Sequence, residues 1–355
     1  MRHWPVWLRT VNKRVVQVQE RFIRNQRVIG HPFYLTLESG NLCNLRCPLC
    51  PTTFRGDTMP RGMLSLENAK TILDQFPALL VVNFSLWGEP FLNKEIFDII
   101  KYARDRKIHT IIQSNFSLPH FDEATAQRIL DSDLSELCFS IDGASQESYE
   151  VYRRKGDLPK VLRNVEMLSR MRREQGRQNP HMIWKMVVNQ HNEHEIGAAR
   201  AEAERLGMEF VAVEIYAPEH LKGAWKPTRP LEEAGVPMHS DVSDQCYQLW
   251  QVMTVNFNGD VFPCCSEWSP NDSLGNVLKQ PVSEIWNHAE YRRRRANNKS
   301  GPPRCDDCHK DKDTLYWKEW QTNTEGKQNP VMLPVTLIAS RPVEVPVESA
   351  PQAHA

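Results

Sequence analysis

The sequence predicts an α/β fold in which a partial (β/α)6 barrel is followed by a smaller cysteine-rich region. Short apolar runs alternate with helical stretches from residue 31 to about 220, which is the order typical of a parallel sheet covered by helices. Pro227, Pro230 and Pro237 then break this alternation. The nine cysteines gather at 43–50 and 246–308, with only Cys138 between, which indicates two metal sites and not a disulfide framework.

Apolar runs are expected to form the strands of the barrel, and the periodic stretches between them its helices. The expected strands are residues 34–37, 81–86, 109–114, 137–141, 182–188 and 210–215. The expected helices are residues 65–76, 93–106, 122–130, 159–173 and 193–206, the last closed by Gly207. In parallel sheets of this kind, ligands bind at the carboxyl ends of the strands, where the loops that follow the strands meet.

The two ends of the chain differ from its middle. Residues 1–30 carry seven Arg or Lys against one Glu, and their apolar residues recur at near-helical spacing: Trp4, Trp7, Leu8, Val11, Val15, Val18 and Phe22. Such a helix rests on a membrane surface or an acidic partner, or packs its apolar stripe on the neighbouring domain. We expect the packed arrangement, which is the usual one. Residues 31–225 form the expected barrel, 240–322 the second region, and 326–355 a proline-rich disordered tail.

The composition excludes some classes of function. The 44 basic and 44 acidic residues cancel, so no overall field attracts nucleic acid. The sequence shows neither a signal peptide nor an apolar run of about 18 residues. With nine cysteines, these features favour a reducing, cytoplasmic setting.

Three cysteines, Cys43, Cys47 and Cys50, follow the first expected strand at C-x3-C-x2-C spacing. Three thiolates hold three irons of a cubane cluster and leave the fourth iron without a protein ligand. An incomplete four-thiolate zinc site is the alternative, although the spacing fits neither a zinc ribbon nor a redox dithiol. The motif resembles the signature of radical S-adenosylmethionine (SAM) enzymes. This resemblance implies a TIM-like partial barrel and a 4Fe-4S cluster whose open iron chelates the methionine part of SAM.

The second expected strand runs into Ser85-Leu86-Trp87-Gly88-Glu89-Pro90, which resembles the Gly-Gly-Glu motif of the same family with Trp87 in place of the first glycine. The resemblance implies that Glu89 holds the methionyl amine of SAM. Gly88 would let backbone approach closely at this point. A turn glycine beside a solvated glutamate is the other interpretation.

Two further strand ends carry polar residues. Period-two alternation in the fourth strand places Cys138, Ser140 and Asp142 on the inner face. The family resemblance implies that Ser140 and Asp142 bind the ribose hydroxyls of SAM, and we expect Cys138 to be a buried free thiol. Asn115 ends the third strand, where its amide would touch SAM or the substrate, or form a turn.

The second cysteine group consists of Cys246, Cys264, Cys305 and Cys308, with a hairpin expected at the Asn258-Gly259 turn. Four thiolates close a metal coordination shell, for zinc as readily as for iron. The C-x12-G-x4-C run from Cys246 to Cys264 resembles the SPASM extension of radical SAM enzymes, which implies an auxiliary 4Fe-4S cluster. Nothing after Cys308 supplies ligands for another one. Full thiolate ligation favours electron transfer over substrate binding.

The resemblance implies an enzyme that reductively cleaves SAM to a 5′-deoxyadenosyl radical and abstracts hydrogen from a carbohydrate-like small molecule or a peptide. Electron loss to the auxiliary cluster would give dehydrogenation. Cys265 would instead return a hydrogen atom and give epimerisation, unless it is a spare ligand or a packed small residue. One alternative is a peptide- or protein-modifying maturase, and another is a non-catalytic zinc or iron–sulfur binding protein. The expected partners are the substrate and an electron donor such as flavodoxin or ferredoxin.

Overall fold

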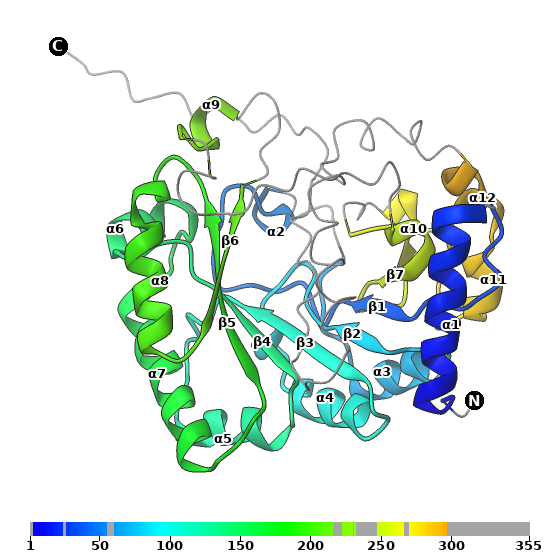
Figure 1. Cartoon of the computed structure of the whole chain (residues 1–355), viewed down its shortest axis with the longest axis horizontal. Coiled ribbons are helices and arrows are strands. Elements are labelled where there is room, and N and C mark those ends of the chain that lie inside the picture. Colours follow the sequence, from blue (N-terminus) through cyan, green and yellow to red (C-terminus); the bar gives the residue numbers. More distant parts are fainter. Residues whose placement is uncertain are drawn as a thin grey trace.

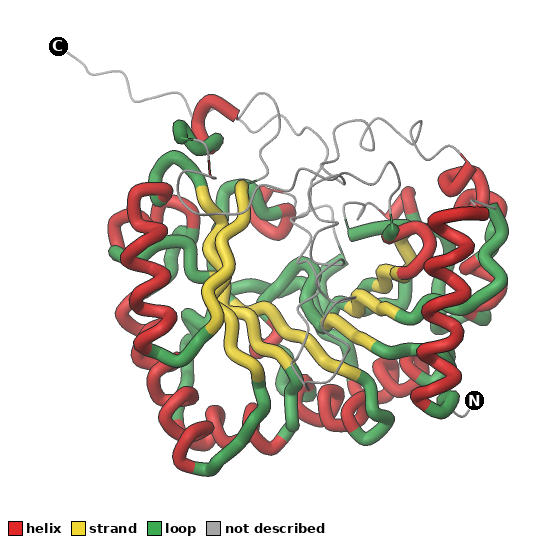
Figure 2. The backbone as a smooth tube through the Cα atoms, viewed as in Figure 1, coloured by secondary structure: helices red, strands yellow, loops and turns green. Residues whose placement is uncertain are grey.

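The fold is built on one twisted sheet whose strands lie side by side and curl around a central space (Figures 1 and 2). The computed structural model describes residues 3–23, 26–54, 60–215, 222–229, 231, 247–265 and 270–296. Within these residues the sheet has eight strands in the order β6-β5-β4-β3-β2-β1-β7-β8. Their bounds are β1 Tyr34–Leu37, β2 Val81–Asn83, β3 His109–Ser114, β4 Glu136–Ser140, β5 His181–Val188, β6 Glu209–Glu214, β7 Val252–Val255 and β8 Val261–Phe262.

All neighbouring strands from β6 to β7 pair in parallel, and only the β7–β8 pair is antiparallel. The six strands expected from the sequence therefore form the curled parallel sheet of a partial barrel, as predicted. The order ends at β6 and β8, which do not pair with each other in the described part of the chain. The barrel is accordingly open on one side.

Helices cover the outer face of the sheet (Figure 1). Those that alternate with the strands from β1 to β6 are α3 Leu66–Leu73, α4 Ile96–Arg104, α5 Glu123–Asp131, α6 Gln146–Tyr152, α7 Leu158–Glu174 and α8 Ile196–Arg205. Short polar side chains cap the amino ends of several of these helices. At α3, Ser65 accepts a hydrogen bond from the Asn68 amide at 3.2 Å, and at α7, Asp157 accepts one from the Lys160 amide at 2.9 Å. Such caps satisfy amides that the first turn leaves without a partner.

The remaining helices after β1 are α2 Pro51–Phe54, α9 Lys222–Trp225, α10 Gln248–Gln251, α11 Val282–Trp286 and α12 Ala289–Ala296. Single turns of other helix types lie at η2 Pro90–Leu92, η3 Glu193–Glu195 and η6 Pro270–Asp272.

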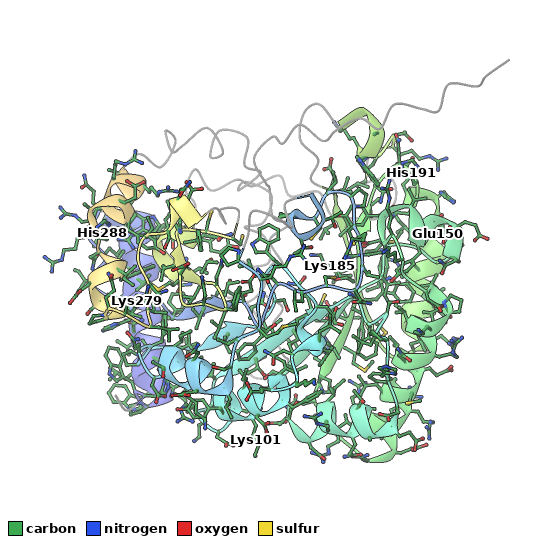
Figure 3. All side chains as sticks on the ribbon, turned by 180° about the vertical axis from the view of Figure 1, so that it is seen from behind. Lys101, Glu150, Lys185, His191, Lys279 and His288 are labelled. Carbon is green, nitrogen blue, oxygen red and sulfur yellow. The ribbon has the colours of Figure 1, made fainter. Side chains whose placement is uncertain are left out.

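Alternation along the strands separates an apolar outer face from a polar inner one. On β4 and β5, Phe139 and Trp184 point outward and are fully buried under the helices. Their neighbours Ser140 and Lys185 are register partners on the opposite face and line a central pocket. Figure 3 shows Lys185 inside the molecule. The outer face thus supplies the core, and the inner face is left for a site.

The C-terminal hairpin joins the barrel sheet, which the sequence did not predict. Strand β7 pairs with β1 from Tyr34↔Val252 to Leu37↔Val255, and β8 folds back on β7. The hairpin itself is as expected: Gly259 adopts φ +88° at the turn, and its amide donates to the Asn256 carbonyl at 2.9 Å. A left-handed φ of this kind favours glycine. The hairpin therefore lies against the first strand of the barrel.

The N-terminal helix α1, Val6–Val18, continues into a π-type turn η1, Gln19–Ile23, and packs on the fold with its polar face. This contradicts the expectation that its apolar stripe would be buried. The buried polar side chains are those of Arg9, Asn12, Lys13, Gln19 and Glu20. The exposed apolar side chains include Trp7, Val11, Val15, Val18 and Phe22.

Hydrogen bonds to backbone explain why this polar face is buried. The Arg9 guanidinium donates to the carbonyls of Trp4, Leu79 and Arg106 at 2.6, 3.0 and 3.0 Å. The Asn12 amide donates to the His31 carbonyl and accepts from the His31 amide, both at 2.9 Å. Burial of polar groups is tolerated when they are bonded in this way. None of the helices among the described residues is long and apolar enough to cross a membrane.

Candidate functional site

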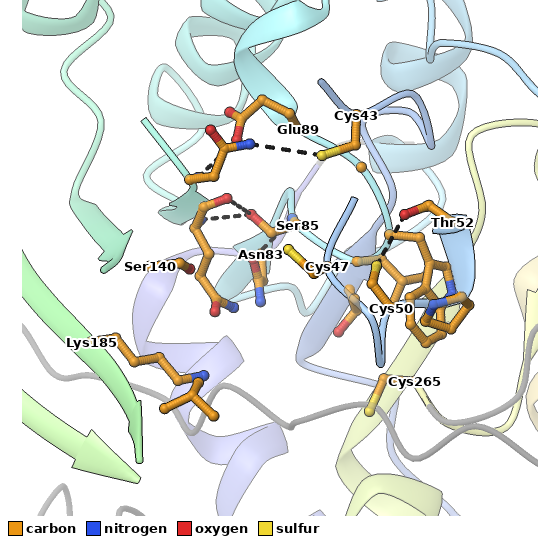
Figure 4. Close-up of a pocket in the computed structure, with 18 of the residues that line it drawn as sticks. Cys43, Cys47, Cys50, Thr52, Asn83, Ser85, Glu89, Ser140, Lys185 and Cys265 are labelled. Carbon is orange, nitrogen blue, oxygen red and sulfur yellow. Dashed lines mark hydrogen bonds between the residues drawn. The ribbon is translucent and has the colours of Figure 1, made fainter. Parts of the chain in front are cut away.

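The three cysteines after β1 lie together on the wall of one pocket at the carboxyl end of the sheet (Figure 4). The pocket has an empty volume of about 1370 Å³, open solvent at its mouth included. Backbone contacts shape the loop: the Cys50 amide donates to the Cys47 carbonyl at 3.1 Å, and the Arg46 amide to the Arg154 carbonyl at 3.0 Å. The predicted position of Cys43, Cys47 and Cys50 on the ligand-binding side of the barrel is therefore what the structure shows.

The chemistry of these thiols fits a metal cluster. Burial raises the pKa of Cys43 to about 12 and that of Cys47 to about 11, so both are protonated until a metal displaces the proton. Among the described residues, no three His, Cys, Asp or Glu side chains surround a position for a single ion. A cubane cluster instead takes one thiolate on each of three irons. The three cysteines line one pocket, which is the arrangement that a cluster held by three thiolates needs.

Glu89 reaches the same pocket from the loop after β2 and is almost completely buried. Its Oε1 accepts from Ser114 Oγ at 2.8 Å and from the Phe91 amide at 3.2 Å, and its Oε2 accepts from the Asn115 amide at 2.8 Å. A carboxylate has about four acceptor positions, so Oε2 keeps one for another donor. Burial raises the pKa of Glu89 to about 7, which a bound ammonium group would lower again.

Gly88 is required where the Glu89 loop crosses the chain that leads to the cysteines. A Cβ at this position would stand 2.3 Å from the Gly40 carbonyl oxygen and 2.9 Å from the Leu42 carbonyl oxygen. The Glu89 amide also donates to the Leu42 carbonyl at 2.8 Å. The close approach expected at this glycine is thus present, and it couples Glu89 to the cysteine loop.

Asn115 supports the cysteine loop. Its Nδ2 donates to Asn44 Oδ1 at 3.1 Å and lies 3.7 Å from Cys43 Sγ, while its Oδ1 accepts from the Ser117 amide at 2.9 Å. The side chain therefore closes a turn, which is one of the two interpretations made from the sequence, and it also lines the pocket. Contact with SAM or substrate stays a prediction.

Ser140 lines the pocket, whereas Asp142, which we expected beside it on the inner face, is fully buried and is not one of the lining residues. Asp142 Oδ2 accepts from Arg153 Nε at 2.5 Å, and Oδ1 accepts from the Val187 amide at 2.7 Å. β4 ends at Ser140, so strand alternation no longer applies at position 142. The carboxylate holds Arg153 in place.

Sequence reasoning missed Arg153. It lines the pocket, and its Nη1 lies 3.8 Å from Cys47 Sγ. No motif marks this residue, since its importance follows from the buried ion pair with Asp142 and from the fold that brings both beside the cysteine loop.

Polar side chains from the strands form the inner part of the pocket. Lys185 is the basic group among them, 3% exposed and opposite Ser140 in the sheet. The other polar strand residues of the lining are Tyr34, Thr36, Asn83 and Gln113, and Ser85 follows β2. Cys138 lies deeper and packs with Ile183 and Val211, as the alternation predicted.

The second cysteine group is only partly described. Cys264 and Cys265 follow β8, while Cys246, Cys305 and Cys308 lie outside the described residues, as does the tail 326–355. Cys265 is buried and lines the central pocket. Its Sγ lies 3.3 Å from Gln248 Nε2, and Figure 4 shows it across the pocket from Ser140. This residue thus shares a pocket with the first cysteine group.

Two family models match the chain. Residues 37–195 match the radical SAM superfamily, and residues 246–309 match SPASM, an iron–sulfur cluster-binding domain. The second match includes Cys246, Cys264, Cys305 and Cys308.

Named relatives and solved structures agree with these matches. The chain is 23% identical over 311 residues to an AdoMet-dependent heme synthase of Methanosarcina barkeri (strain Fusaro / DSM 804), covering 75% of this chain and 85% of that protein. It is 28% identical over 145 residues to the mycofactocin maturase MftC of Mycolicibacterium smegmatis (strain ATCC 700084 / mc(2)155), covering 41% of this chain and 36% of that protein.

Streptococcus suis SuiB bound to S-adenosylmethionine superimposes with a TM-score of 0.64 at 15% identity, covering 85% of this chain and 75% of SuiB. Native anSMEcpe with bound AdoMet gives a TM-score of 0.55 at 15% identity, covering 78% and 86% of the two chains. At such low identity these structures show the shared fold alone.

Proposed function

Because the chain belongs to the SPASM-containing subgroup of the radical SAM superfamily, we propose that its central pocket binds SAM beside a polar substrate and abstracts hydrogen from that substrate. The substrate is a carbohydrate-like small molecule or a peptide with an anionic group. The radical SAM and SPASM domains imply 4Fe-4S clusters and SAM as cofactors. The observation that supports the proposal most strongly is that Cys43, Cys47, Cys50 and Glu89 all line one cavity.

The chain's own residues divide the work of holding the cofactors. Cys43, Cys47 and Cys50 would hold the cluster, which supplies the electron that cleaves SAM to a 5′-deoxyadenosyl radical. Glu89 Oε2, with its remaining acceptor position, would accept from the methionyl ammonium. Ser140 would meet a ribose hydroxyl. The buried lining residues would shield a reactive species from water except at the mouth of the pocket.

Charge in the pocket favours an anionic substrate group. The charged lining residues are Glu89, Arg153 and Lys185. Arg153 is neutralised by Asp142, and Glu89 is assigned to SAM. Lys185 also lines the pocket, where its ammonium group would attract a carboxylate or phosphate of the substrate. The surrounding hydroxyl and amide groups would bind polar atoms of a sugar or peptide backbone. Relatives include a mycofactocin maturase, which supports the peptide alternative.

The outcome depends on what happens to the substrate radical. Electron loss to an auxiliary cluster held by Cys246, Cys264, Cys305 and Cys308 would give dehydrogenation or a crosslink. Hydrogen return from Cys265 would give epimerisation, and the specific observation in its favour is that Cys265 lines the pocket. Turnover in D2O distinguishes them: epimerisation by Cys265 places deuterium in the product, and Cys265→Ala abolishes that label. A label unchanged in Cys265→Ala would reject the donor role.

Anaerobic reconstitution tests the proposal as a whole. Metal analysis should show about eight irons per chain, in keeping with two 4Fe-4S clusters. Reduction by flavodoxin, ferredoxin or dithionite should then yield 5′-deoxyadenosine. A substrate deuterated at the reactive carbon should transfer deuterium into that product. Zinc alone, with no 5′-deoxyadenosine, would instead support the non-catalytic binding protein.

A further inference from the structure

The face of α1 and η1 that points away from the fold carries a continuous apolar stripe. The stripe consists of Trp7, Val11, Val15, Val18 and Phe22, at intervals of four, four, three and four residues. Such intervals keep side chains on one side of a helix. Trp7 is 68% exposed and Phe22 72%, and the three valines between them are also exposed. The stripe is about 22 Å long at the rise of an α-helix.

This exposure is built into the way the helix packs. The opposite face is fixed by Arg9, Asn12 and Gln19, whose side chains bond to backbone groups of other segments. Turning the helix to bury the stripe would strip these polar groups of their partners. Figure 1 shows α1 at the outer edge of the molecule, beside α11 and α12. The stripe therefore faces outward in the folded protein.

The exposed charges that α1, η1 and the segment after them carry are of one sign. Among residues 3–23 and 26–31, the exposed charged side chains are Arg14, Arg21 and Arg27, while the acidic Glu20 is buried against Gln251. Arg14 and Arg21 are seven residues apart and follow one edge of the stripe, as the helical repeat of 3.6 residues requires. The surface that covers this face should then be apolar in its middle and negative at its edge.

We propose that α1 and η1 attach the protein to a membrane surface that carries anionic lipid, with the stripe in the acyl boundary and the arginines among the headgroups. Aromatic and aliphatic side chains on one face and arginines beside them are the features of helices that lie in the plane of such an interface. An antiparallel pair of chains joined through their stripes would bring Arg14 and Arg21 of each chain against those of the other.

Apolar exposure beyond the stripe also favours lipid over a partner helix. Ile23 is exposed, and Ile29, 77% exposed, lies beside η1 because its amide donates to Gln19 Oε1 at 2.9 Å. A partner helix covers one seam, whereas a lipid surface covers neighbouring apolar side chains as well. Attachment of this kind needs no membrane-spanning helix.

Vesicle co-sedimentation of the full chain tests the proposal. The wild-type chain should pellet with vesicles of phosphatidylcholine containing about one third phosphatidylglycerol, and much less with pure phosphatidylcholine or at high salt. Trp7→Gln with Phe22→Gln should lower the partition coefficient at least about tenfold. Arg14→Glu with Arg21→Glu should lower it similarly on anionic vesicles only.

Val6→Gln is the matched control, because Val6 is exposed on the same helix but off the stripe. Circular dichroism should be the same for all variants, since each change is at an exposed position. Failure of the wild-type chain to pellet with anionic vesicles at low salt would overturn the proposal. So would equal binding by the Trp7→Gln, Phe22→Gln variant. A concentration-dependent dimer that this variant loses, in the absence of vesicles, would assign the stripe to a second copy instead.

Discussion

Asp142→Asn should destabilise the fold strongly, although it only replaces a carboxylate by an amide of nearly the same size. Asp142 is fully buried, and its partner Arg153 has a side chain only 15% exposed. Asparagine keeps an oxygen for the Val187 amide but removes the negative charge, so the buried guanidinium loses its carboxylate partner. Breaking a buried pair from one side costs about 3–5 kcal/mol. We expect about 3 kcal/mol, since the small exposure of Arg153 lets water reach it.

Urea denaturation of the reconstituted protein measures this cost. Asp142→Asn with Arg153→Met removes both charges and should recover most of the loss, because a buried pair is often replaceable by apolar groups. The matched surface control is Arg170→Gln, which breaks an exposed pair with Glu123 and should change the free energy of unfolding by less than about 1 kcal/mol. An Asp142→Asn midpoint equal to that of the wild-type chain would refute the reasoning, as would a double variant no better than the single one.

Two other carboxylates give predictions of different kinds. Burial raises the pKa of Glu38 to about 8, so the folded state holds its proton more tightly than the unfolded chain, and the free energy of unfolding falls as the pH rises from about 4.5 to 8. Glu38→Gln has no carboxyl group to ionise at this position and therefore does not lose stability in this way. In thermal unfolding its free energy of unfolding should exceed that of the wild-type chain by up to about 5 kcal/mol near pH 9 and equal it near pH 5. Parallel pH profiles of the two proteins would contradict this. Glu89→Gln keeps an acceptor for Ser114 but loses the charge that would pair with the methionyl ammonium, so the KM for SAM should rise at least about tenfold with little change in iron content. An unchanged KM would exclude the assigned role.

The sequence predicted the parts of the fold that depend on local pattern. The strands and the cysteine loop could be predicted from the sequence because apolar alternation and ligand spacing are properties of short segments. The close approach at Gly88 was also foreseen, since only glycine fits there. The sequence did not predict that β7 joins β1, because that pairing links segments more than two hundred residues apart.

The errors have physical causes at particular residues. Alternation placed Asp142 on the inner face, but the strand ends at Ser140 and the carboxylate turns to Arg153 and Val187. Helical periodicity identified the two faces of α1 but not which one is buried. Which face is buried depends on the carbonyl groups of Leu79 and Arg106, which are remote from α1 in sequence and accept hydrogen bonds from the Arg9 guanidinium. Both errors come from polar groups whose partners only the folded chain provides.

The most direct test of the central claim is the formation of 5′-deoxyadenosine by the reduced, reconstituted chain in the presence of SAM. The wild-type chain should form it, and Cys47→Ala should not, because one thiolate of the cluster is lost. Cys138→Ala is the matched control, since Cys138 is a buried thiol outside the pocket lining and its loss should leave the product yield almost unchanged. 5′-Deoxyadenosine from Cys47→Ala at the wild-type rate, or none from the wild-type chain with its iron in place, would contradict the account.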